Sequence, residues 1–295
     1  RGFDAPYACV DCIEAALTLP YPEGAVKERE VFMTLVASDQ SKAQRHAFFA
    51  EREVAKIPDV PKHTPRQDVK SAAVIGCGTM GGGIAMNFAT AGIPVTIVET
   101  TQEALDRGLK VVRGNYQRSA DKGRFPQEEV EARMDRFDGK LELAALAECD
   151  LVIEAVFEDM GVKKEVFGKL DAVCKPGAIL ASNTSYLDVD EIAAATSRPA
   201  DVMGMHFFSP ANVMKLLENI RGEKSSPDIL VTANAVGKKA GKIPVTVGVC
   251  NGFAGNRMGG AAAPIGVDHE ISRVESALDC PLAHQVGHLK FHYLA

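Results

Sequence analysis

Beyond residue 70, short apolar runs alternate with segments whose apolar residues recur every three or four positions. The apolar runs have the length of β-strands, and they span residues 71–75, 93–98, 151–156, 178–181 and 202–205. Helical spacing is clear after Gln102, at Leu105, Leu109, Val112 and Tyr116. Strands that alternate with helices predict βαβ units, and strands that are apolar throughout predict a parallel sheet covered on both faces. We therefore expect an α/β fold with a doubly wound, mainly parallel sheet.

The N-terminal part of the chain has a different pattern, which predicts helices. One helix is expected between Pro6 and Leu17, because Pro6 suits a first helical turn and apolar residues follow it at helical spacing. Pro20 and Pro22 end this helix. A second, long helix is expected over roughly residues 25–54.

A proline-rich segment separates these helices from the α/β region. Residues 58–65 hold three prolines in eight positions, which excludes a helix and predicts a stiff, extended linker. We place a domain boundary there. Residues 1–66 then form a helical segment with its linker, residues 67–250 form the α/β domain, and residues 251–295 form a short tail of atypical sequence.

Composition narrows the class of protein. The 295 residues are 46% hydrophobic and 24% charged, which is an ordinary globular balance and excludes global disorder. No apolar run approaches the ~18 residues that a membrane span needs. The formal net charge of −6 argues against binding to nucleic acid, which depends on clustered positive charge. An anionic ligand held by backbone N–H groups remains compatible with that charge.

The cysteines and histidines do not predict a metal site. Seven cysteines at irregular spacing argue against a disulfide framework and indicate a reducing compartment. Cys9 and Cys12 form a C-x-x-C, but no second pair completes a metal site, so we favour two small apolar residues on a helix. His284, His288 and His292 recur every four residues, but no carboxylate joins them at ligand spacing. We expect no bound metal.

A glycine pattern after the first strand indicates a dinucleotide site. Gly76, Gly78 and Gly81 form a G-x-G-x-x-G that follows a predicted strand and opens a predicted helix. Gly76 permits a tight turn, Gly78 lets the backbone approach a pyrophosphate, and Gly81 lets helix and strand pack closely. The first helical turn, with Thr79 and Met80, supplies N–H groups for the phosphates. The alternative is that these glycines only make a tight turn.

An acidic residue completes this Rossmann-type pattern. Glu99 ends the next strand, 23 positions after Gly76, where a carboxylate can accept hydrogen bonds from ribose hydroxyls. The same carboxylate would repel a 2′-phosphate. The sequence therefore predicts NAD as the cofactor, in preference to NADP.

A histidine and a carboxylate are candidates for acid–base chemistry. His206 ends a buried-type strand, and ligands bind at the carboxyl ends of strands in such sheets. Glu218 follows twelve positions later between apolar residues, where a buried carboxylate needs a partner. A His206–Glu218 pair would fix the imidazole tautomer for a general base. From the residues alone, a hydrogen-bonded core histidine is an equal alternative.

Residues 67–258 resemble the NAD domain of L-3-hydroxyacyl-CoA dehydrogenases. The motifs that carry the resemblance, in order along the chain, are Val74-Ile75-Gly76-Cys77-Gly78-Thr79-Met80-Gly81, Val152-Ile153-Glu154-Ala155-Val156, Ser182-Asn183-Thr184-Ser185, Gly204-Met205-His206-Phe207-Phe208-Ser209-Pro210 and Gly252-Phe253-Ala254-Gly255-Asn256-Arg257. Their order and spacing both fit the family. The resemblance implies NAD-dependent oxidation of the C3 hydroxyl of a (S)-3-hydroxyacyl-CoA to the 3-ketoacyl-CoA in fatty-acid β-oxidation.

The resemblance also implies roles for individual residues. His206 would be the general base and Glu218 would orient it. Ser185 would bind the substrate hydroxyl or thioester region and Asn256 would help to position the substrate, although Ser185 could instead cap a helix near Asp188 and Asn256 could be a turn residue. Glu158 and Lys163 match positions near the cofactor in the family.

The two ends of the chain add further expectations. Residues 37–50 resemble the segment that joins the enoyl-CoA hydratase and dehydrogenase halves of multifunctional β-oxidation enzymes, and the family's C-terminal helical domain would begin within residues 251–295. We expect a chain shortened at both ends. The alternative function is therefore an NAD-binding module with little or no turnover, because the substrate domain is missing. A homodimer or a thiolase partner is suggested by analogy alone. We expect a cytoplasmic enzyme of bacterial type, with a peroxisomal or mitochondrial location left open.

Overall fold

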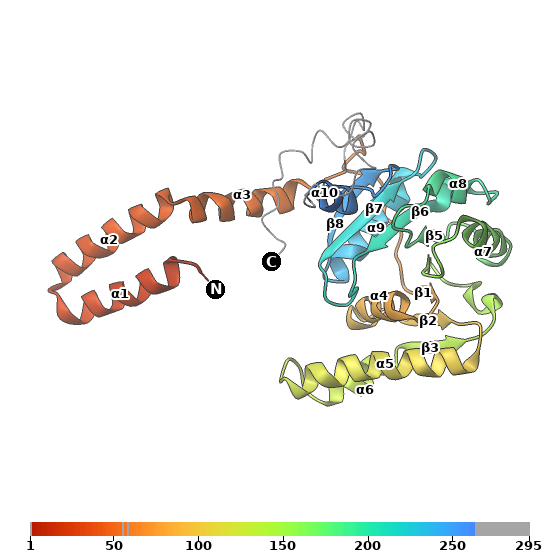
Figure 1. The fold of residues 1–295 in the computed structure, drawn as a ribbon, viewed down its shortest axis with the longest axis horizontal. Coiled ribbons are helices and arrows are strands. Elements are labelled where there is room, and N and C mark those ends of the chain that lie inside the picture. The colour runs from red at the N-terminus through yellow and green to blue at the C-terminus, as the bar shows by residue number, and fades with distance from the viewer. Residues whose placement is uncertain (1, 55, 58, 263–295) are drawn as a thin grey trace. The chain divides into compact units, whose positions relative to one another are not determined.

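The computed structural model of the protein describes residues 2–54, 56–57 and 59–262 (Figure 1). Its internal contacts divide the chain into two units, Arg1–Glu53 and Val54–Ala295. Within the described residues, no helix is long and apolar enough to cross a membrane.

The first unit consists of α1 (Ala5–Thr18), α2 (Tyr21–Ala37) and α3 (Asp39–Glu53). The expectation of one helix over residues 25–54 is wrong, because Ser38 ends α2 in an extended conformation, with ψ 156°. Its hydroxyl then accepts a hydrogen bond from Ser41 N at 3.2 Å, which caps the start of α3. Pro22 follows the end of α1 and also lies in the first turn of α2. Proline is tolerated there, because an N–H in the first turn has no hydrogen-bond partner within the helix.

The second unit is built on one eight-stranded sheet with the order β3-β2-β1-β4-β5-β6-β7-β8. The strands are β1 (Ala72–Ile75), β2 (Val95–Val98), β3 (Phe137–Lys140), β4 (Leu151–Glu154), β5 (Ile179–Ser182), β6 (Val202–Phe207), β7 (Leu216–Arg221) and β8 (Ile243–Gly248). All neighbouring pairs are parallel except β6 and β7, which are antiparallel. The expected doubly wound, mainly parallel sheet is confirmed, and β3, β7 and β8 are strands that the sequence did not predict.

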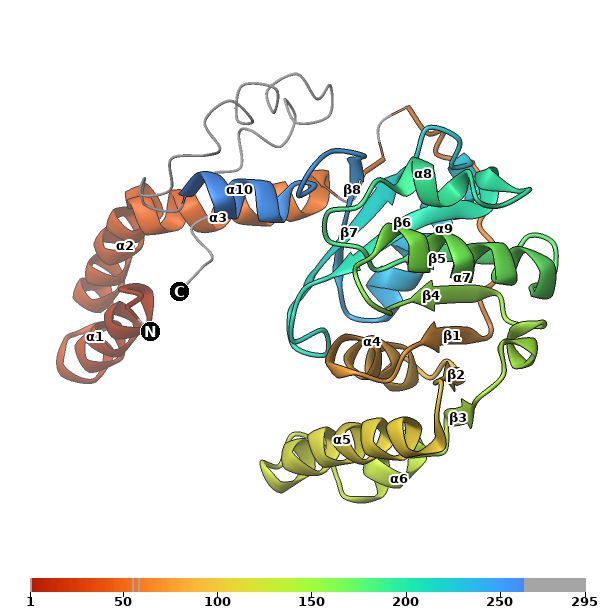
Figure 2. The same cartoon turned by 45° about the vertical axis from the view of Figure 1, so that its right-hand side comes forward.

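Helices cover both faces of this sheet (Figure 2). One face packs against α4 (Thr79–Thr90) and α9 (Pro227–Lys239), with Phe88 and Leu230 in the same apolar cluster as Val74. The other face packs against α7 (Met160–Val173) and α8 (Val189–Ala193), with Phe167 and Ile192 in a cluster with Ala73. Because side chains alternate along a strand, neighbouring residues of β1 enter opposite clusters, and both faces are buried.

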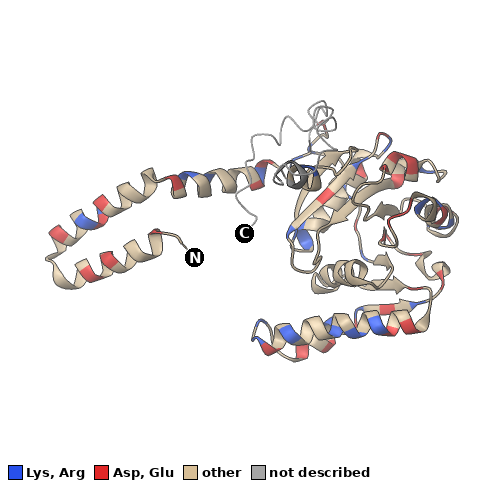
Figure 3. Ribbon diagram, in the orientation of Figure 1, with Lys and Arg blue, Asp and Glu red and all other residues tan. Residues whose placement is uncertain are grey.

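The remaining elements lie at the edges of the sheet or in its connections. They are α5 (Gln102–Asp121), α6 (Glu128–Met134), α10 (Gly255–Ala262) and the short 3₁₀ helices η1 (Leu143–Leu146) and η2 (Pro199–Asp201). Acidic and basic side chains are interspersed along α5 (Figure 3). This mixture forms a solvated surface and not a basic patch.

The structure places two of the candidate cysteines, but not the three candidate histidines. Cys9 and Cys12 lie on α1, one exposed and the other half-buried, and both are free thiols. Among the described residues, no group of three or more His, Cys, Asp and Glu side chains is placed to hold a metal ion. His284, His288 and His292 lie outside the described residues.

Candidate functional site

The glycine turn after β1 has a backbone that only glycine accommodates at two of its three positions. Gly76 has φ +96°, and a Cβ there would lie 2.9 Å from Ala155 O. A Cβ on Gly81 would lie 1.9 Å from Gly76 O, so the turn and α4 touch with no side chain between them. Gly78 differs, because a Cβ there would meet nothing within 4 Å. The turn is therefore tight inside and open at Gly78.

The open side of this turn fits an anionic ligand. Gly78 is the N-cap of α4 and contributes no side-chain cap, so the N–H groups of the first turn have no side-chain acceptor there. Gly78 and Thr79 are exposed and Met80 is half-buried. A bare helix N-terminus of this kind suits a dinucleotide pyrophosphate through its N–H groups and its dipole.

Glu99 connects β2 to the glycine turn. Its Oε1 accepts a hydrogen bond from Cys77 N at 2.6 Å, and its Oε2 accepts one from Thr100 N at 3.0 Å. The carboxylate thus lies beside the turn, as the predicted contact with ribose requires. Burial, helped by the charge of Glu99, raises the pKa of the Cys77 thiol to about 11, so this cysteine is a packing group.

His206 and Glu218 form a buried pair across an antiparallel pair of strands. They are direct cross-strand partners in β6 and β7, and Nδ1 of His206 lies 2.8 Å from Oε2 of Glu218. His206 is 4% exposed and Glu218 1%. Because an ionised carboxylate only accepts hydrogen bonds, we assign the proton to Nδ1 of His206. Within the described part of the chain, Nε2 makes no hydrogen bond and is the atom that can take a proton.

The second oxygen of Glu218 holds the segment that follows β8. Oε1 accepts hydrogen bonds from Ala254 N at 2.9 Å and Gly255 N at 2.7 Å. Asn256 follows directly in the first turn of α10, so Glu218 brings the start of α10 to the histidine. The rings of Phe208 and Phe253 flank the imidazole, with centroids 4.5 Å and 5.9 Å from its own. These aromatic neighbours were not anticipated from the sequence.

The turn after β5 joins the same region. Phe207 N donates to Oδ1 of Asn183 at 2.8 Å, which ties this turn to the residue beside His206. Ser185 lies two residues after Asn183 and is half-buried. It does not cap α8, because Asp188 does so, with its Oδ1 accepting from Asp190 N at 2.8 Å. The alternative role of Ser185 as a helix cap is therefore excluded, and its contact with substrate stays a prediction.

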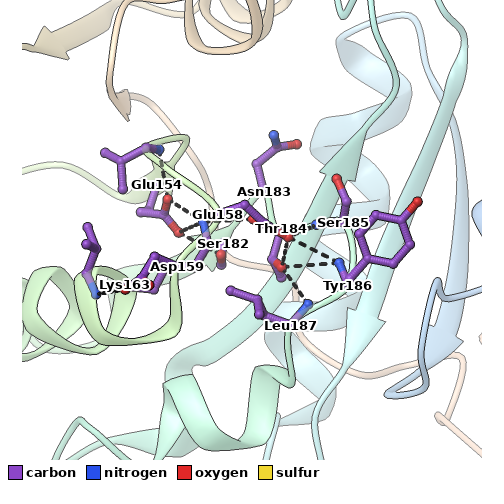
Figure 4. A network of polar contacts seen from close by, with 12 residues as sticks. Glu154, Glu158, Asp159, Lys163, Ser182, Asn183, Thr184, Ser185, Tyr186 and Leu187 are labelled. Atoms are coloured by element: carbon purple, nitrogen blue, oxygen red, sulfur yellow. Dashed lines mark hydrogen bonds and ion pairs between the residues drawn. The ribbon is translucent and has the colours of Figure 1, made fainter.

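The side chains of Glu158 and Lys163 form hydrogen bonds and ion pairs with other residues of the protein (Figure 4). Oε1 of Glu158 accepts hydrogen bonds from Thr184 Oγ1, Ser185 N and Tyr186 N, at 2.6, 2.7 and 3.2 Å. Partial burial raises the pKa of Glu158, but these hydrogen bonds and the charge of Lys163 outweigh burial, so the pKa is lowered. Lys163 is 1% exposed, and its ammonium binds Glu154, a residue that the sequence did not single out.

The loop between β6 and β7 is held by a buried lysine that the sequence also did not reveal. Lys242 is 8% exposed and donates from Nζ to Ala211 O at 2.6 Å and Met214 O at 2.8 Å. Asn87 of α4 also donates to Ala211 O, at 3.1 Å. The loop after His206 is thereby fixed to both α4 and the residue before β8.

This lysine predicts a pH dependence of stability. Burial lowers the pKa of Lys242 to about 8, so between pH 8 and pH 10.5 the unfolded chain binds more protons at this position than the folded one. The free energy of unfolding linked to this group therefore rises with pH across that window and is flat below it. From pH 7 to pH 10, the stability difference between the parent and Lys242→Met should shift by roughly 2 kcal/mol in favour of the parent. Urea unfolding of both proteins at both pH values measures this shift, and a difference independent of pH would contradict it.

Comparisons with known proteins agree with this geometry. Residues 71–250 match the family described as "3-hydroxyacyl-CoA dehydrogenase, NAD binding domain". The chain is 47% identical over 262 residues to a peroxisomal bifunctional enzyme from Danio rerio, covering 88% of this chain and 36% of that protein. It is 38% identical over 297 residues to a peroxisomal fatty acid beta-oxidation multifunctional protein from Arabidopsis thaliana, covering 97% of this chain and 41% of that protein.

A solved structure gives the same relationship. The (S)-3-hydroxybutyryl-CoA dehydrogenase from Ralstonia eutropha is 34% identical, with a TM-score of 0.63, covering 65% of this chain and 68% of that one. The chain spans 36% and 41% of the length of the two curated relatives, so it corresponds to one part of such proteins. The chain therefore belongs to the 3-hydroxyacyl-CoA dehydrogenase family and carries the family's NAD-binding domain.

Proposed function

We propose that the chain catalyses the NAD-dependent oxidation of the C3 hydroxyl of a (S)-3-hydroxyacyl-CoA to the 3-ketoacyl-CoA. The observation that carries this proposal is the His206–Glu218 pair, with Nδ1 and Oε2 2.8 Å apart. Oxidation of a secondary alcohol needs a base for the hydroxyl proton and an acceptor for the hydride from C3. NAD supplies the hydride acceptor when bound, and the open glycine turn at Gly78 fits its pyrophosphate.

The residues of the chain have separate tasks in this proposal. Nε2 of His206 takes the proton of the C3 hydroxyl, and the Nδ1–H group keeps its hydrogen bond to Glu218, whose charge stabilises the imidazolium. The hydrogen bonds from Ala254 N and Gly255 N to its Oε1 hold Glu218 in place beside the imidazole. Ser185 binds the substrate oxygen and Asn256 positions the acyl-CoA.

The relatives support a wider setting for this reaction. The relative from Danio rerio is named a peroxisomal bifunctional enzyme, and the one from Arabidopsis thaliana is named a peroxisomal fatty acid beta-oxidation multifunctional protein. We infer that acyl-CoA thioesters of that pathway are the substrates. The same names refer to peroxisomes, so we propose a peroxisomal location in preference to the bacterial cytoplasm expected from the sequence.

The test is oxidation of NADH by the purified chain with acetoacetyl-CoA as substrate, followed at 340 nm. Turnover that depends on both compounds supports the dehydrogenase. Binding of NADH without turnover would instead support the alternative, an NAD-binding module, and no binding of NADH would contradict both.

A further inference from the structure

Glu154 is a fully buried carboxylate at the centre of the sheet, at the carboxyl end of β4. It lies between Ile75 of β1 and Ser182 of β5 in the strand register and is 0% exposed. It accepts hydrogen bonds from Val156 N at 2.8 Å and Ser182 Oγ at 2.6 Å. An ionised carboxylate at such depth also needs a counter-charge.

Lys163 supplies that counter-charge from the first turns of α7. Its Nζ lies 2.8 Å and 3.0 Å from the two carboxylate oxygens of Glu154. It also lies 3.3 Å from Oε2 of Glu158. One ammonium group is thus shared by two carboxylates that would otherwise repel each other. With the side chain of Lys163 only 1% exposed, its charge is directed at these carboxylates and not at solvent.

Glu158 connects Lys163 to the turn after β5 (Figure 4). Its Oε2 faces Lys163, and its Oε1 accepts the N–H groups of Ser185 and Tyr186. The backbone position of Ser185 therefore depends on where Glu158 is held. Glu158 also accepts a hydrogen bond from Thr184 Oγ1, but Thr184 belongs to this same turn. Among the described residues, Lys163 is therefore the side chain that links Glu158 to the centre of the sheet.

We propose that Glu154 and Lys163 form a buried positioning pair for the turn that carries Ser185: Glu154 fixes the ammonium of Lys163, and the ammonium fixes Glu158. Neither residue touches substrate in this account. The effect on the order of the turn is independent of any activity, whereas the effect on catalytic rate rests on the proposed function. A direct contact of Lys163 with the cofactor is the competing account.

The variant Glu154→Gln/Lys163→Met tests the pair, because it removes both charges together and leaves no unpaired ion in the core. If it does not fold, Glu154→Gln/Lys163→Gln replaces it, since an amide pair retains hydrogen bonds to Val156 and Ser182. The matched control is Asp150→Asn/Lys175→Met. That pair, 2.7 Å apart, lies at the opposite end of β4, where Asp150 also accepts backbone N–H groups.

The first readout is hydrogen exchange at the backbone amides of Ser185 and Tyr186. We expect these amides to exchange ~10-fold faster in the Glu154/Lys163 variant and unchanged in the Asp150/Lys175 control. Unchanged exchange in both variants would overturn the proposal. Faster exchange throughout the sheet would overturn it as well, because the pair would then stabilise the fold as a whole.

The second readout separates positioning from contact with the cofactor. The single variant Glu154→Gln keeps Lys163, and with it any contact of Lys163 with the cofactor. It should lower kcat by ~10–100-fold, while the Kd for NADH changes by less than ~3-fold. In a Glu158→Gln background, Glu154→Gln should lower kcat by less than ~3-fold, because the link is already broken. If the losses of kcat in the two backgrounds multiply, or if only the affinity for NADH falls, the proposal is overturned in favour of direct contact with the cofactor. If the parent chain has no turnover, the proposed function fails, and the exchange readout alone decides the positioning.

Discussion

Replacing His206 by asparagine is expected to lower kcat by ~10²–10⁴-fold, the usual contribution of a general base. The amide nitrogen of asparagine occupies nearly the position of Nδ1 and can still donate to Glu218, which lies 2.8 Å from Nδ1. The variant therefore deletes Nε2 and leaves the buried carboxylate with a partner. Initial rates with acetoacetyl-CoA and NADH measure the loss. NADH binding should stay within ~2-fold of the parent, because β4 and β5 separate the strand of His206 from the strand that precedes the glycine turn.

The control for this variant is His46→Asn on α3, where the histidine is exposed. It should leave kcat unchanged. If His206→Asn retained more than a tenth of the parent kcat, His206 would be a core histidine with a satisfied hydrogen bond and not the base.

Replacing Gly78 by alanine is expected to weaken NADH binding by ~10-fold or more without loss of stability. A Cβ at this position meets nothing within 4 Å in the free protein, and φ −70° with ψ −166° is extended backbone that alanine adopts readily. A pyrophosphate at the turn, however, would come into contact with the added methyl group. Fluorescence titration with NADH and a thermal unfolding curve give the two quantities.

Two other glycine variants are controls for this prediction. In Gly114→Ala on α5, the added Cβ would make one ordinary contact, with Arg118 Nη1 at 3.7 Å, and NADH binding should stay unchanged. Gly81→Ala places a Cβ 1.9 Å from Gly76 O and should destabilise the fold itself. Unchanged NADH affinity in Gly78→Ala would mean that the dinucleotide does not approach this turn.

The central strands could be predicted because burial on both faces requires continuous apolar runs, as in β1 and β4. The three strands that were missed break this rule for identifiable reasons. β3 is an edge strand with alternating burial, and β8 is an edge strand that tolerates Pro244. β7 carries the polar residues Glu218 and Asn219 inside the sheet, where they pair with His206 and Asn234. Those partnerships arise only from tertiary structure.

The candidate site could be predicted from the sequence only in part. Glu218 was found because a carboxylate between apolar residues needs a partner, and the same argument applies to Glu154 in Val152-Ile153-Glu154-Ala155-Val156. Its partner Lys163 lies nine positions away on a helix, so only the packing of α7 against the sheet reveals the pair. Lys242 gave no signal, because its partners are backbone carbonyls that carry no sequence information.

The most direct test of the central claim is transfer of deuterium to acetoacetyl-CoA by the purified chain, from NADH that carries deuterium at both C4 positions. Mass spectrometry of the product detects even slow turnover. Our account predicts one deuterium at C3 of 3-hydroxybutyryl-CoA with the parent chain, and ~10²–10⁴-fold less labelled product in the same time with the same amount of His206→Asn. A parent chain that binds NADH but forms no labelled product, or an asparagine variant that forms as much as the parent, would contradict the account.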